Sequence, residues 1–188
     1  MKILFNNSIF FNQHYGGVSR YFSLIFQNLI KKDISFKVIT PIYKNRYLKS
    51  LHKKHKSGLY IPRYPVNGFL KKFNESISLW LLEKEKSEII HDTFYSGYLE
   101  RIKNKKKIIT VYDSIHEKFE KFYDTKKIIS DRKKIFQNTD RIISISNTTK
   151  EDLIDIYKIS EKKIHVTYIS CYTYNIILSF FYTFLVNI

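Results

Sequence analysis

Short apolar runs alternate along this chain with longer stretches in which apolar residues recur every three or four positions. The first run, Lys2 to Phe5, ends at two asparagines and predicts a buried strand. Gly16 and Gly17 precede a stretch with the spacing of an amphipathic helix. The apolar positions of that helix are Val18, Tyr21, Phe22, Leu24, Ile25, Leu29 and Ile30. The chain therefore opens with a strand, a glycine loop and a helix.

The same alternation continues over the rest of the chain. It predicts strands at residues 35–40, 59–61, 88–91, 107–112, 141–146 and 163–169. It predicts helices at residues 69–86, 98–102, 126–138 and 148–157, the last with Thr148 and Glu151 at capping-box spacing. The helix at 69–86 depends on apolar residues at Phe69, Leu70, Phe73, Ile77, Trp80 and Leu81. Strands that alternate with helices predict an α/β fold, a Rossmann-like parallel sheet with helices on both faces.

Right-handed crossovers bring the carboxyl ends of parallel strands to one edge of the sheet, where such folds bind ligands. Polar residues follow the predicted strands at that edge. They are Asn6, Asn7, His91, Asp92, Asp113, Ser146 and Asn147. We expect a ligand site there.

Gly16, Gly17 and His91 are the first candidates for chemistry. The backbone N–H groups of a helix start attract phosphate, and glycine lets an anion approach the main chain, although a glycine pair also serves in tight turns. Arg20 adds a forked donor for phosphate or carboxylate, or is a surface arginine. His91 is a proton carrier or a donor to a sugar hydroxyl, or a buried structural group. No histidine and cysteine share metal-ligand spacing, so no metal site is predicted.

The charge is strongly positive and uneven, with 33 Lys and Arg against 17 Asp and Glu and a formal net charge of +16. No acidic residue lies between Asp33 and Glu75, whereas ten lysines and arginines do. This segment predicts an anionic partner, such as a membrane surface, a phosphorylated ligand or nucleic acid, or else a solvated basic loop. Nucleic acid is the least favoured, because most aromatic residues have core spacing.

The length of 188 residues suits one domain. Cys171 is the only cysteine, which excludes an intramolecular disulfide and a multi-cysteine zinc site and fits a reducing compartment. The first residues lack the features of a signal peptide. We therefore expect a cytoplasmic protein.

Four segments together resemble the N-terminal domain of family 4 glycosyltransferases. They are Gly16-Gly17-Val18-Ser19-Arg20-Tyr21, Ile90-His91-Asp92-Thr93-Phe94-Tyr95, Thr110-Val111-Tyr112-Asp113-Ser114-Ile115-His116-Glu117-Lys118-Phe119 and the stretch from Asp140 to Leu153. The resemblance covers residues 1–170 and implies the N-terminal, acceptor-side half of a GT-B enzyme. In that architecture two Rossmann-like domains face each other and the second holds most of the nucleotide sugar.

The resemblance also implies roles for individual residues. Gly16 and Gly17 would lie near the donor phosphates, and His91 would lie near the transferred sugar. Asp113 would match the aspartate of the family's His-Asp pair, but Tyr112 stands where the histidine is expected. The implied enzyme is a retaining hexosyltransferase without metal or cofactor. It would transfer a sugar from a nucleotide sugar to a lipid-linked or polysaccharide acceptor in cell-surface glycan synthesis.

Residues 171–188 depart from the family pattern, because they form an uncharged apolar tail where the family continues into its donor-binding domain. We expect the tail to be a truncation or frameshift product, or a C-terminal membrane anchor. The chain would then be inactive alone or would need a separate donor domain. The alternative function is a non-catalytic basic module that binds anionic membrane or glycan, peripheral at the inner face of the membrane.

Overall fold

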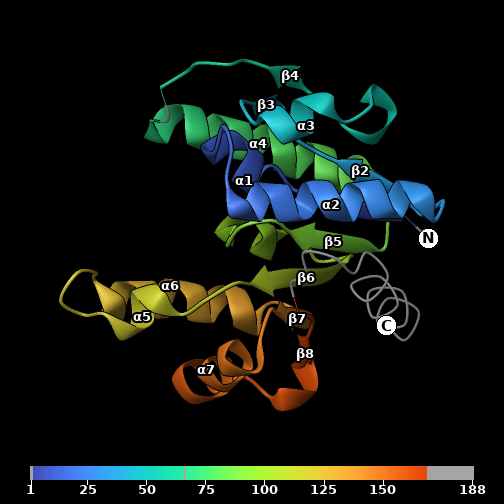
Figure 1. The fold of residues 1–188 in the computed structure, drawn as a ribbon. Helices are drawn as coiled ribbons and strands as arrows, with labels where there is room; N and C mark the ends of the chain where they lie inside the picture. Colours follow the sequence, from blue (N-terminus) through green and yellow to red (C-terminus); the bar gives the residue numbers. More distant parts are fainter. Residues whose placement is uncertain (1, 66, 169–188) are drawn as a thin grey trace. The chain divides into compact units, whose positions relative to one another are not determined.

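The computed structural model describes residues 2–65 and 67–168, so the predicted tail at 171–188 lies outside the described residues. The chain divides into two compact units, Met1–Lys107 and Ile108–Ile188, and each is described by itself. Both units are α/β (Figure 1). The sheet has six parallel strands, which confirms the Rossmann-like α/β prediction.

The first unit contains a three-stranded part of the sheet in which β1 lies between β2 and β5. Leu4 on β1 is in register with Lys37 on β2 and with Ile90 on β5. The elements of this unit are β1 (Lys2–Phe5), α1 (Ser8–Asn12), α2 (Gly17–Lys31), β2 (Ser35–Val38), β3 (Ile42–Tyr43), α3 (Arg46–Ser50), the 3-10 helix η1 (Lys53–His55), β4 (Leu59–Tyr60), α4 (Gly68–Lys84), β5 (Ile89–Asp92) and the 3-10 helix η2 (Gly97–Arg101).

Neighbouring residues of β1 show that helices cover both faces of this part of the sheet. Side chains alternate between the faces of a strand, so Leu4 and Phe5 point in opposite directions. Leu4 belongs to a buried cluster with Leu82 of α4, while Phe5 packs edge-on against Phe22 and Phe26 of α2 at 5.9 and 4.9 Å between ring centroids. The apolar stripe of α2 and the inner face of α4 thus fix β1 between two layers.

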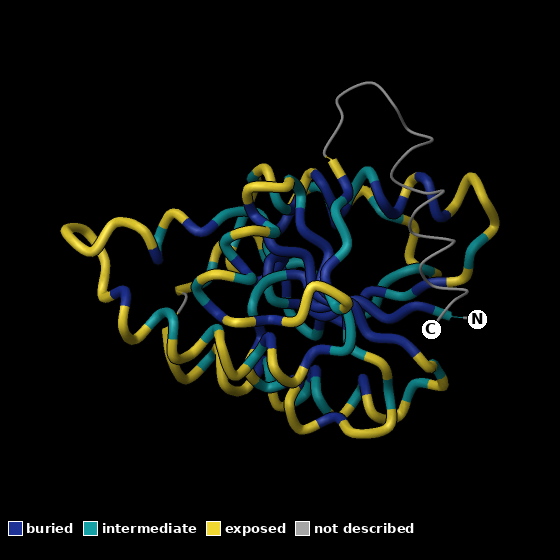
Figure 2. The backbone as a smooth tube through the Cα atoms, turned by 90° about the horizontal axis from the view of Figure 1, so that it is seen from below, coloured by how far each residue is buried: buried dark blue, intermediate teal, exposed yellow. Residues whose placement is uncertain are grey.

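The second unit contains the other three strands, with β7 between β6 and β8. Ile142 of β7 is in register with Ile109 of β6 and with Ile164 of β8. Its elements are β6 (Lys106–Val111), which begins in the last two residues of the first unit, α5 (Ile115–Lys118), α6 (Thr125–Gln137), β7 (Arg141–Ser144), α7 (Asn147–Tyr157), the 3-10 helix η3 (Glu161–Lys163) and β8 (Ile164–Val166). The loop between α5 and α6 is exposed, as the yellow tube at the far left of Figure 2 shows.

The predicted strand at 59–61 does not join the main sheet. β4 pairs with β3 in a separate parallel sheet of two strands. The chain can leave the main sheet here because residue 58 is glycine. Its φ is 91°, and a Cβ atom at this position would lie only 1.7 Å from the Thr40 carbonyl oxygen, so no residue with a side chain fits. The short helices α1, α3 and α5 were not predicted, since four or five residues are too few to show a period.

The predicted helix at 69–86 is confirmed as α4, but the apolar residues used to predict it do not all face inward. Phe69 is 82% exposed, Phe73 50% and Trp80 53%. The inner face instead buries Asn74, Ser78 and Leu82. Asn74 replaces a missing sheet neighbour for β3, because its side chain accepts from the Ile42 N–H at 2.9 Å and donates to the Ile42 carbonyl at 3.2 Å.

Candidate functional site

A buried polar network joins the carboxyl ends of β1 and β5. The Asn6 side-chain amide donates to Asp92 Oδ1 at 2.8 Å and to Ser96 Oγ at 2.7 Å. Its carbonyl oxygen accepts from the Thr93 N–H at 2.8 Å and from the Thr93 hydroxyl at 2.6 Å. Asn6, Asp92, Thr93 and Ser96 are all at most 5% exposed. The predicted strand edge is therefore real in the first unit, and Asn6 is the residue that connects its two strands.

Asp92 is the only acidic group among the bonded residues of this network, and it accepts hydrogen bonds from Asn6, Phe94 and Ser96. Its Oδ1 accepts from the Phe94 N–H at 3.0 Å and the Ser96 hydroxyl at 2.8 Å, and its Oδ2 accepts from the Ser96 N–H at 2.6 Å. Burial raises the pKa of Asp92, while these hydrogen bonds act in the opposite direction by favouring the carboxylate. The donors make Asp92 a structural anchor for the loop after β5.

Asn7 and Tyr98 extend the polar edge beyond Asn6. The Tyr98 hydroxyl donates to Asn7 Oδ1 at 2.6 Å, and burial together with the nearby Asp92 charge raises the pKa of this phenol. The Ser8 and Ser96 hydroxyls are hydrogen-bonded to each other. Sequence reasoning named Asn6, Asn7 and Asp92 at this edge and missed Ser8, Ser96 and Tyr98, which carry no strand-end signal of their own.

His91 lies on β5 with its imidazole enclosed by aromatic rings. Its exposed fraction is 0%, the Phe5 ring stacks on it at 5.3 Å and the Phe22 ring meets it edge-on at 5.3 Å. Burial lowers the pKa of His91 to about 3, so the ring is neutral at physiological pH. A neutral ring can donate or accept one hydrogen bond, but it is a poor proton carrier at that pH.

The glycine loop precedes α2 and is held by α3. The Asn45 side chain donates to the Gln13 carbonyl at 3.1 Å, and the Arg46 N–H donates to the His14 carbonyl at 3.0 Å. A Cβ built on Gly16 would lie 2.2 Å from Gln13 Oε1, so the loop is closed around that position. A Cβ on Gly17, the first residue of α2, would meet nothing within 4 Å.

The start of α2 has the features of an anion site without an anionic side chain of its own. No acidic residue occupies its first turn, and the Arg20 N–H is the first to bond within the helix, to the Gly16 carbonyl at 2.9 Å. The N–H groups before it therefore have no partner within the helix. Arg20 is exposed one turn in. Gly16, Gly17 and Arg20 are thus brought together at one helix end, as the sequence predicted.

Asp113, Ser146 and Asn147 belong to the second unit. Asp113 is half-buried and its Oδ1 accepts from the Ile115 N–H at 3.2 Å, which closes the turn after β6. Ser146 is the N-cap residue of α7, and its hydroxyl accepts from the Thr149 N–H at 3.1 Å. The cap therefore lies two residues before the predicted position, Thr148. Asn147 is exposed as the first residue of that helix.

A buried glutamate in the second unit was not predicted as a site residue. Glu117 on α5 pairs with Arg132 of α6 at 2.5 Å, and its carboxylate also accepts from the Tyr157 hydroxyl of α7. Its side chain is 1% exposed. The pair ties three helices together, and the sequence offers no spacing that would have revealed it.

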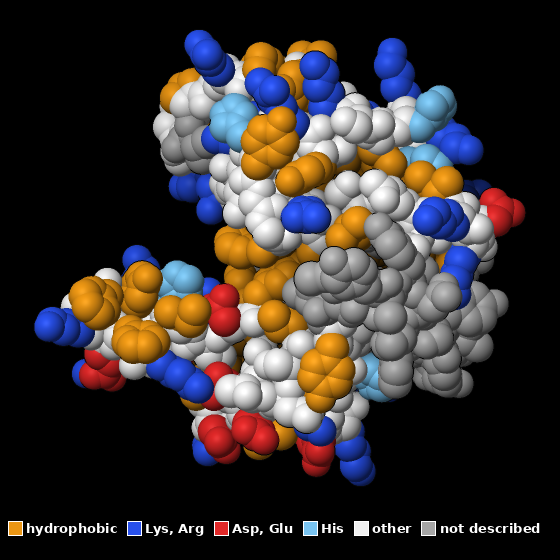
Figure 3. Space-filling model, viewed as in Figure 1, with side chains coloured by type: hydrophobic (Ala, Val, Ile, Leu, Met, Phe, Trp, Pro, Cys, Tyr) orange, Lys and Arg blue, Asp and Glu red, His pale blue; other side chains and the backbone are white. Residues whose placement is uncertain are grey.

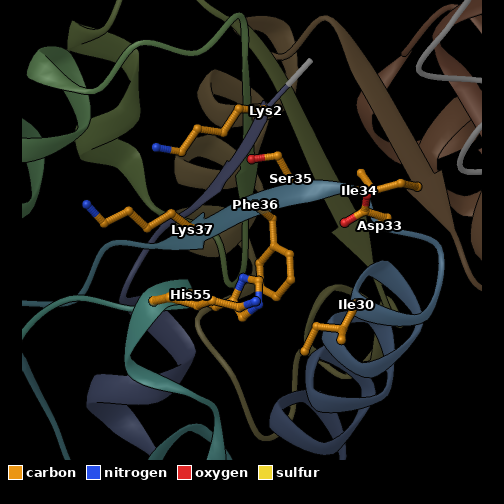
Figure 4. Close-up of a pocket in the computed structure, with 9 residues that line it drawn as sticks. Lys2, Ile30, Asp33, Ile34, Ser35, Phe36, Lys37 and His55 are labelled. Carbon is orange, nitrogen blue, oxygen red and sulfur yellow. The ribbon is translucent and has the colours of Figure 1, made fainter.

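Two pockets of the first unit lie outside this network. A cavity of about 380 Å³ lies at the amino ends of β1 and β2, where Figure 4 shows His55 stacked on Phe36. Lys2 and Lys37 at its border are already paired with Glu85, which lowers the pKa of that carboxyl through their hydrogen bonds. A second cavity, of about 500 Å³, lies between α4 and η2.

Within residues 2–65 and 67–168, no group of three histidine, cysteine, aspartate or glutamate side chains is arranged to hold a metal ion. In the same part of the chain no helix is long and apolar enough to cross a bilayer. The C-terminal anchor alternative concerns residues outside the described ones.

Comparison with protein families matches residues 15–169 to Glycosyltransferase Family 4. The fold is similar to a glycosyltransferase from Rickettsia africae, with a TM-score of 0.54, 21% identity and coverage of 89% of this chain and 42% of that one. It is similar to Anabaena HepE, crystallised with UDP and glucose, with a TM-score of 0.59, 12% identity and coverage of 89% and 44%.

A third similar structure is the lipopolysaccharide outer core galactosyltransferase WaaB in its apo form. Its TM-score is 0.55, its identity 15%, and the match covers 89% of this chain and 45% of that one. The chain thus spans less than half the length of each of these three structures. The comparison with curated proteins found no match.

Proposed function

Because the chain belongs to glycosyltransferase family 4, we propose that it is the acceptor-side domain of an enzyme that transfers a hexose from a nucleotide sugar. The acceptor is a lipid-linked or polysaccharide glycan in cell-surface glycan synthesis. Nucleotide-sugar binding is shared with a second Rossmann-like domain, without which this domain is inactive. The observation that carries the proposal is the family match over residues 15–169. This range includes the candidate site residues Gly16, Gly17, Arg20, His91 and Asp113.

The glycine loop and the start of α2 support a role beside the donor diphosphate. The leaving nucleoside diphosphate gains negative charge during transfer, and helix N–H groups stabilise such charge without a metal ion. The open space at Gly17 lets a phosphate reach the backbone, and Arg20 supplies a forked donor one turn later. We propose metal-independent transfer on this basis, and retention of configuration because the family match implies it.

Gly17→Ala tests this role with little risk to folding, because a methyl group there meets nothing within 4 Å. We expect the rate of transfer to fall at least about tenfold, because the added methyl group would fill the space through which a phosphate approaches the backbone. Gly68→Ala is the matched control, since Gly68 is also the first residue of a helix and also has no neighbour within 4 Å. Equal activity of both variants would remove Gly17 from the site.

His91 is proposed as the catalytic histidine, acting as a neutral hydrogen-bonding ring close to the transferred sugar. Its lowered pKa argues against proton transfer, so the activity of the enzyme will not follow a histidine titration near pH 6.5. His91→Ala will abolish transfer, whereas His91→Gln, which can still donate or accept, will retain part of it. Unchanged turnover in a folded His91→Ala variant would contradict this assignment.

Asp113 is proposed as the second catalytic residue, by its match to the family's aspartate. In the structure its carboxylate accepts a hydrogen bond from the Ile115 N–H, so Asp113→Asn keeps that acceptor while removing the charge. We expect Asp113→Asn to lower transfer and leave stability unchanged. Asp140→Asn in the same unit is the charge-matched control.

Reconstitution tests the whole proposal. The purified chain would be mixed with a separately expressed nucleotide-sugar domain of a family 4 enzyme, and release of nucleoside diphosphate would be followed over a panel of nucleotide sugars and acceptors. Turnover that needs both components supports the proposal. No turnover, and no nucleotide-sugar binding by the mixture, contradicts it.

A second candidate function, a non-catalytic module at an anionic membrane, is favoured by the outer face of α4. Phe69, Phe73 and Trp80 lie on that face with large exposed fractions, and Lys84 lies 3.7 Å from the Trp80 ring centroid. Exposed aromatic residues with nearby lysines are typical of helices that rest in a membrane interface. This supports contact with a membrane surface, and the inner, cytoplasmic face is proposed because the chain belongs to glycosyltransferase family 4.

Liposome sedimentation separates this function from the enzymatic one. The double variant Phe69→Ser, Phe73→Ser should lose binding to vesicles that contain anionic lipid, whereas Phe122→Ser, at a 71% exposed aromatic residue of the second unit, should not. Binding that is independent of anionic lipid, or equally reduced by the control, would contradict membrane docking through α4.

A further inference from the structure

The loop before α2, with α3, η1 and β4, presents tyrosines and cations in alternation. Tyr15, Arg46, Tyr47, Lys49, Lys56 and Tyr60 make up this tyrosine–cation surface. All six belong to the first unit, and Figure 3 shows lysine, arginine and hydrophobic side chains mixed over α3, β3 and β4 at the top of the view. Tyr15 directly precedes Gly16, so the surface begins beside the glycine loop.

The contacts within the surface form a continuous series. The Tyr15 and Tyr47 rings meet edge-to-face at 5.3 Å, and the Arg46 guanidinium lies 5.7 Å from the Tyr15 centroid. Hydrogen bonding to the Tyr15 hydroxyl is the largest cause of the raised pKa of Arg46. Lys49 Nζ lies 4.7 Å from the Tyr60 centroid, and Tyr60 also contributes to the raised pKa of Arg46.

In the described part of the chain, no acidic side chain is paired with the cations of this surface. The sequence has no acidic residue between Asp33 and Glu75, and among the described residues no ion pair involves Arg46, Lys49 or Lys56. Lys56 Nζ donates instead to the carbonyls of Leu48 and Lys49, at 2.7 and 2.6 Å. Burial, then the charges of Lys53 and Lys49, lower the pKa of Lys56. Holding these cations together raises the free energy of the folded unit, and a bound anion would offset that.

The exposed aromatic rings restrict the class of anion that this surface can bind. Tyr15 is 56% exposed and therefore offers a ring face to a ligand. Tyrosine rings stack on the apolar faces of sugars, while guanidinium and ammonium groups bind carboxylate or phosphate. A simple inorganic anion would need only the cations, and a neutral sugar only the rings.

We propose that the tyrosine–cation surface binds an acidic saccharide, a glycan acceptor that carries carboxylate or phosphate groups. This proposal rests on the proposed function, because it assigns the acceptor of the same enzyme to an anionic class and to these six residues. Tyr15 and Tyr47 stack on a sugar unit next to the glycine loop, and Arg46, Lys49 and Lys56 hold the charged groups.

Calorimetric titration of the full chain at raised salt tests the surface without any donor. The probes are a short oligogalacturonate, a short phosphorylated mannan fragment and a neutral maltooligosaccharide of similar length, with the first two separating carboxylate from phosphate. We expect at least one acidic probe to bind and the neutral probe not to bind. The double variant Arg46→Gln, Lys49→Gln should weaken that binding by at least about tenfold, and Tyr15→Leu by about fivefold.

Matched controls separate a specific site from general attraction to a basic protein. Lys126→Gln with Lys127→Gln removes two exposed charges from α6, and Tyr123→Leu removes a 40% exposed ring, both in the second unit. These variants should change affinity less than about twofold. An equal loss in the control pair, or neutral binding as tight as acidic binding, would overturn the proposal.

A short oligothymidylate is the last arm, because aromatic residues among cations also suit single-stranded nucleic acid. Tighter binding of this probe than of the acidic saccharides, with the same dependence on Tyr15, would overturn the proposal in favour of nucleic acid. The two proposals fail separately. A chain that binds acidic saccharide but supports no transfer contradicts the proposed function, whereas transfer to neutral acceptors only contradicts the acidic-saccharide site.

Discussion

At the scale of single residues, Asn6 and His91 show how burial changes the meaning of a polar residue at a strand end. Asn6 makes four hydrogen bonds to Asp92, Thr93 and Ser96 and has no exposed surface. His91 is one register position from the same edge, yet its ring lies among phenylalanines. The polar edge of the first unit is therefore an internal framework whose hydrogen bonds fix the loop after β5.

Asn6→Ala should lower the free energy of unfolding by about 2–4 kcal/mol, because several buried partners lose a hydrogen bond at once. Urea unfolding measures the change. Asn12→Ala is the control, since Asn12 is exposed and donates only to the Ser8 carbonyl at 2.8 Å. A loss in Asn6→Ala no larger than in Asn12→Ala would contradict the bridging role.

His91 should make the protein less stable in acid. Its folded pKa is lowered to about 3, so its contribution is fully present above the unfolded value of 6.5 and is lost as the pH falls toward 3. The unfolding free energy of wild type relative to that of His91→Leu should therefore fall by about 1.4 kcal/mol for each pH unit by which the pH drops in this range. Comparing the two proteins removes the opposite contribution of Asp92, whose pKa is raised. A difference that is constant with pH would show that His91 is accessible to water.

At the scale of elements, the strands and long helices follow from the sequence, whereas the direction that α4 faces does not. Runs such as Ile108 to Val111 are buried wherever they lie, so period and length suffice to predict them. Asn74 faces inward because its side chain hydrogen-bonds to the backbone of Ile42 on β3. Ile42 lies 32 residues earlier in the sequence. Local periodicity carries no information about such a partner.

The same limit applies to the candidate site. Strand ends predicted Asn6, His91 and Asp92, because these positions depend only on where a strand stops. Ser96 and Tyr98 join the network through the path of the loop after β5. The Glu117–Arg132 pair depends on how three helices meet, and no spacing within one helix encodes that.

Substitutions in α4 should show by their effect on stability which face of the helix is buried. Leu82→Ala, at 0% exposure, should cost about 2–5 kcal/mol of unfolding free energy, whereas Phe69→Ala, at 82% exposure, should cost less than about 0.5 kcal/mol. Chemical denaturation of both variants checks the pair. A larger loss at Phe69 than at Leu82 would mean that the aromatic stripe belongs to the core.

At the scale of the whole molecule, the formal net charge of +16 opposes the folded state. The tyrosine–cation surface concentrates part of that charge in the first unit. An acidic glycan and an anionic membrane would both supply negative charge to this excess of positive charge. They differ in the residues involved, since one uses Tyr15 and Arg46 and the other uses Phe69 and Phe73.

Salt should therefore stabilise the chain. Raising NaCl from low concentration to about 0.5 M should increase the unfolding free energy by about 1 kcal/mol, since screening weakens repulsion between exposed lysines. Thermal and urea unfolding at several salt concentrations measure the effect. Arg46→Gln with Lys49→Gln should reduce the salt dependence more than Lys126→Gln with Lys127→Gln does. A salt dependence of opposite sign would show that ion pairs outweigh the repulsion.

The bridge between Asn6 and Asp92 has a consequence for how the chain is made. The two residues are 86 positions apart, so β1 cannot pair on both sides until β5 has been synthesised. Until then the apolar strand formed by Ile3, Leu4 and Phe5 has one open edge. Nascent chains with such an edge are prone to wrong pairing. The edge of β1 is therefore closed only when β5 has been made, and a chaperone that binds β1 until then would raise the yield of folded protein.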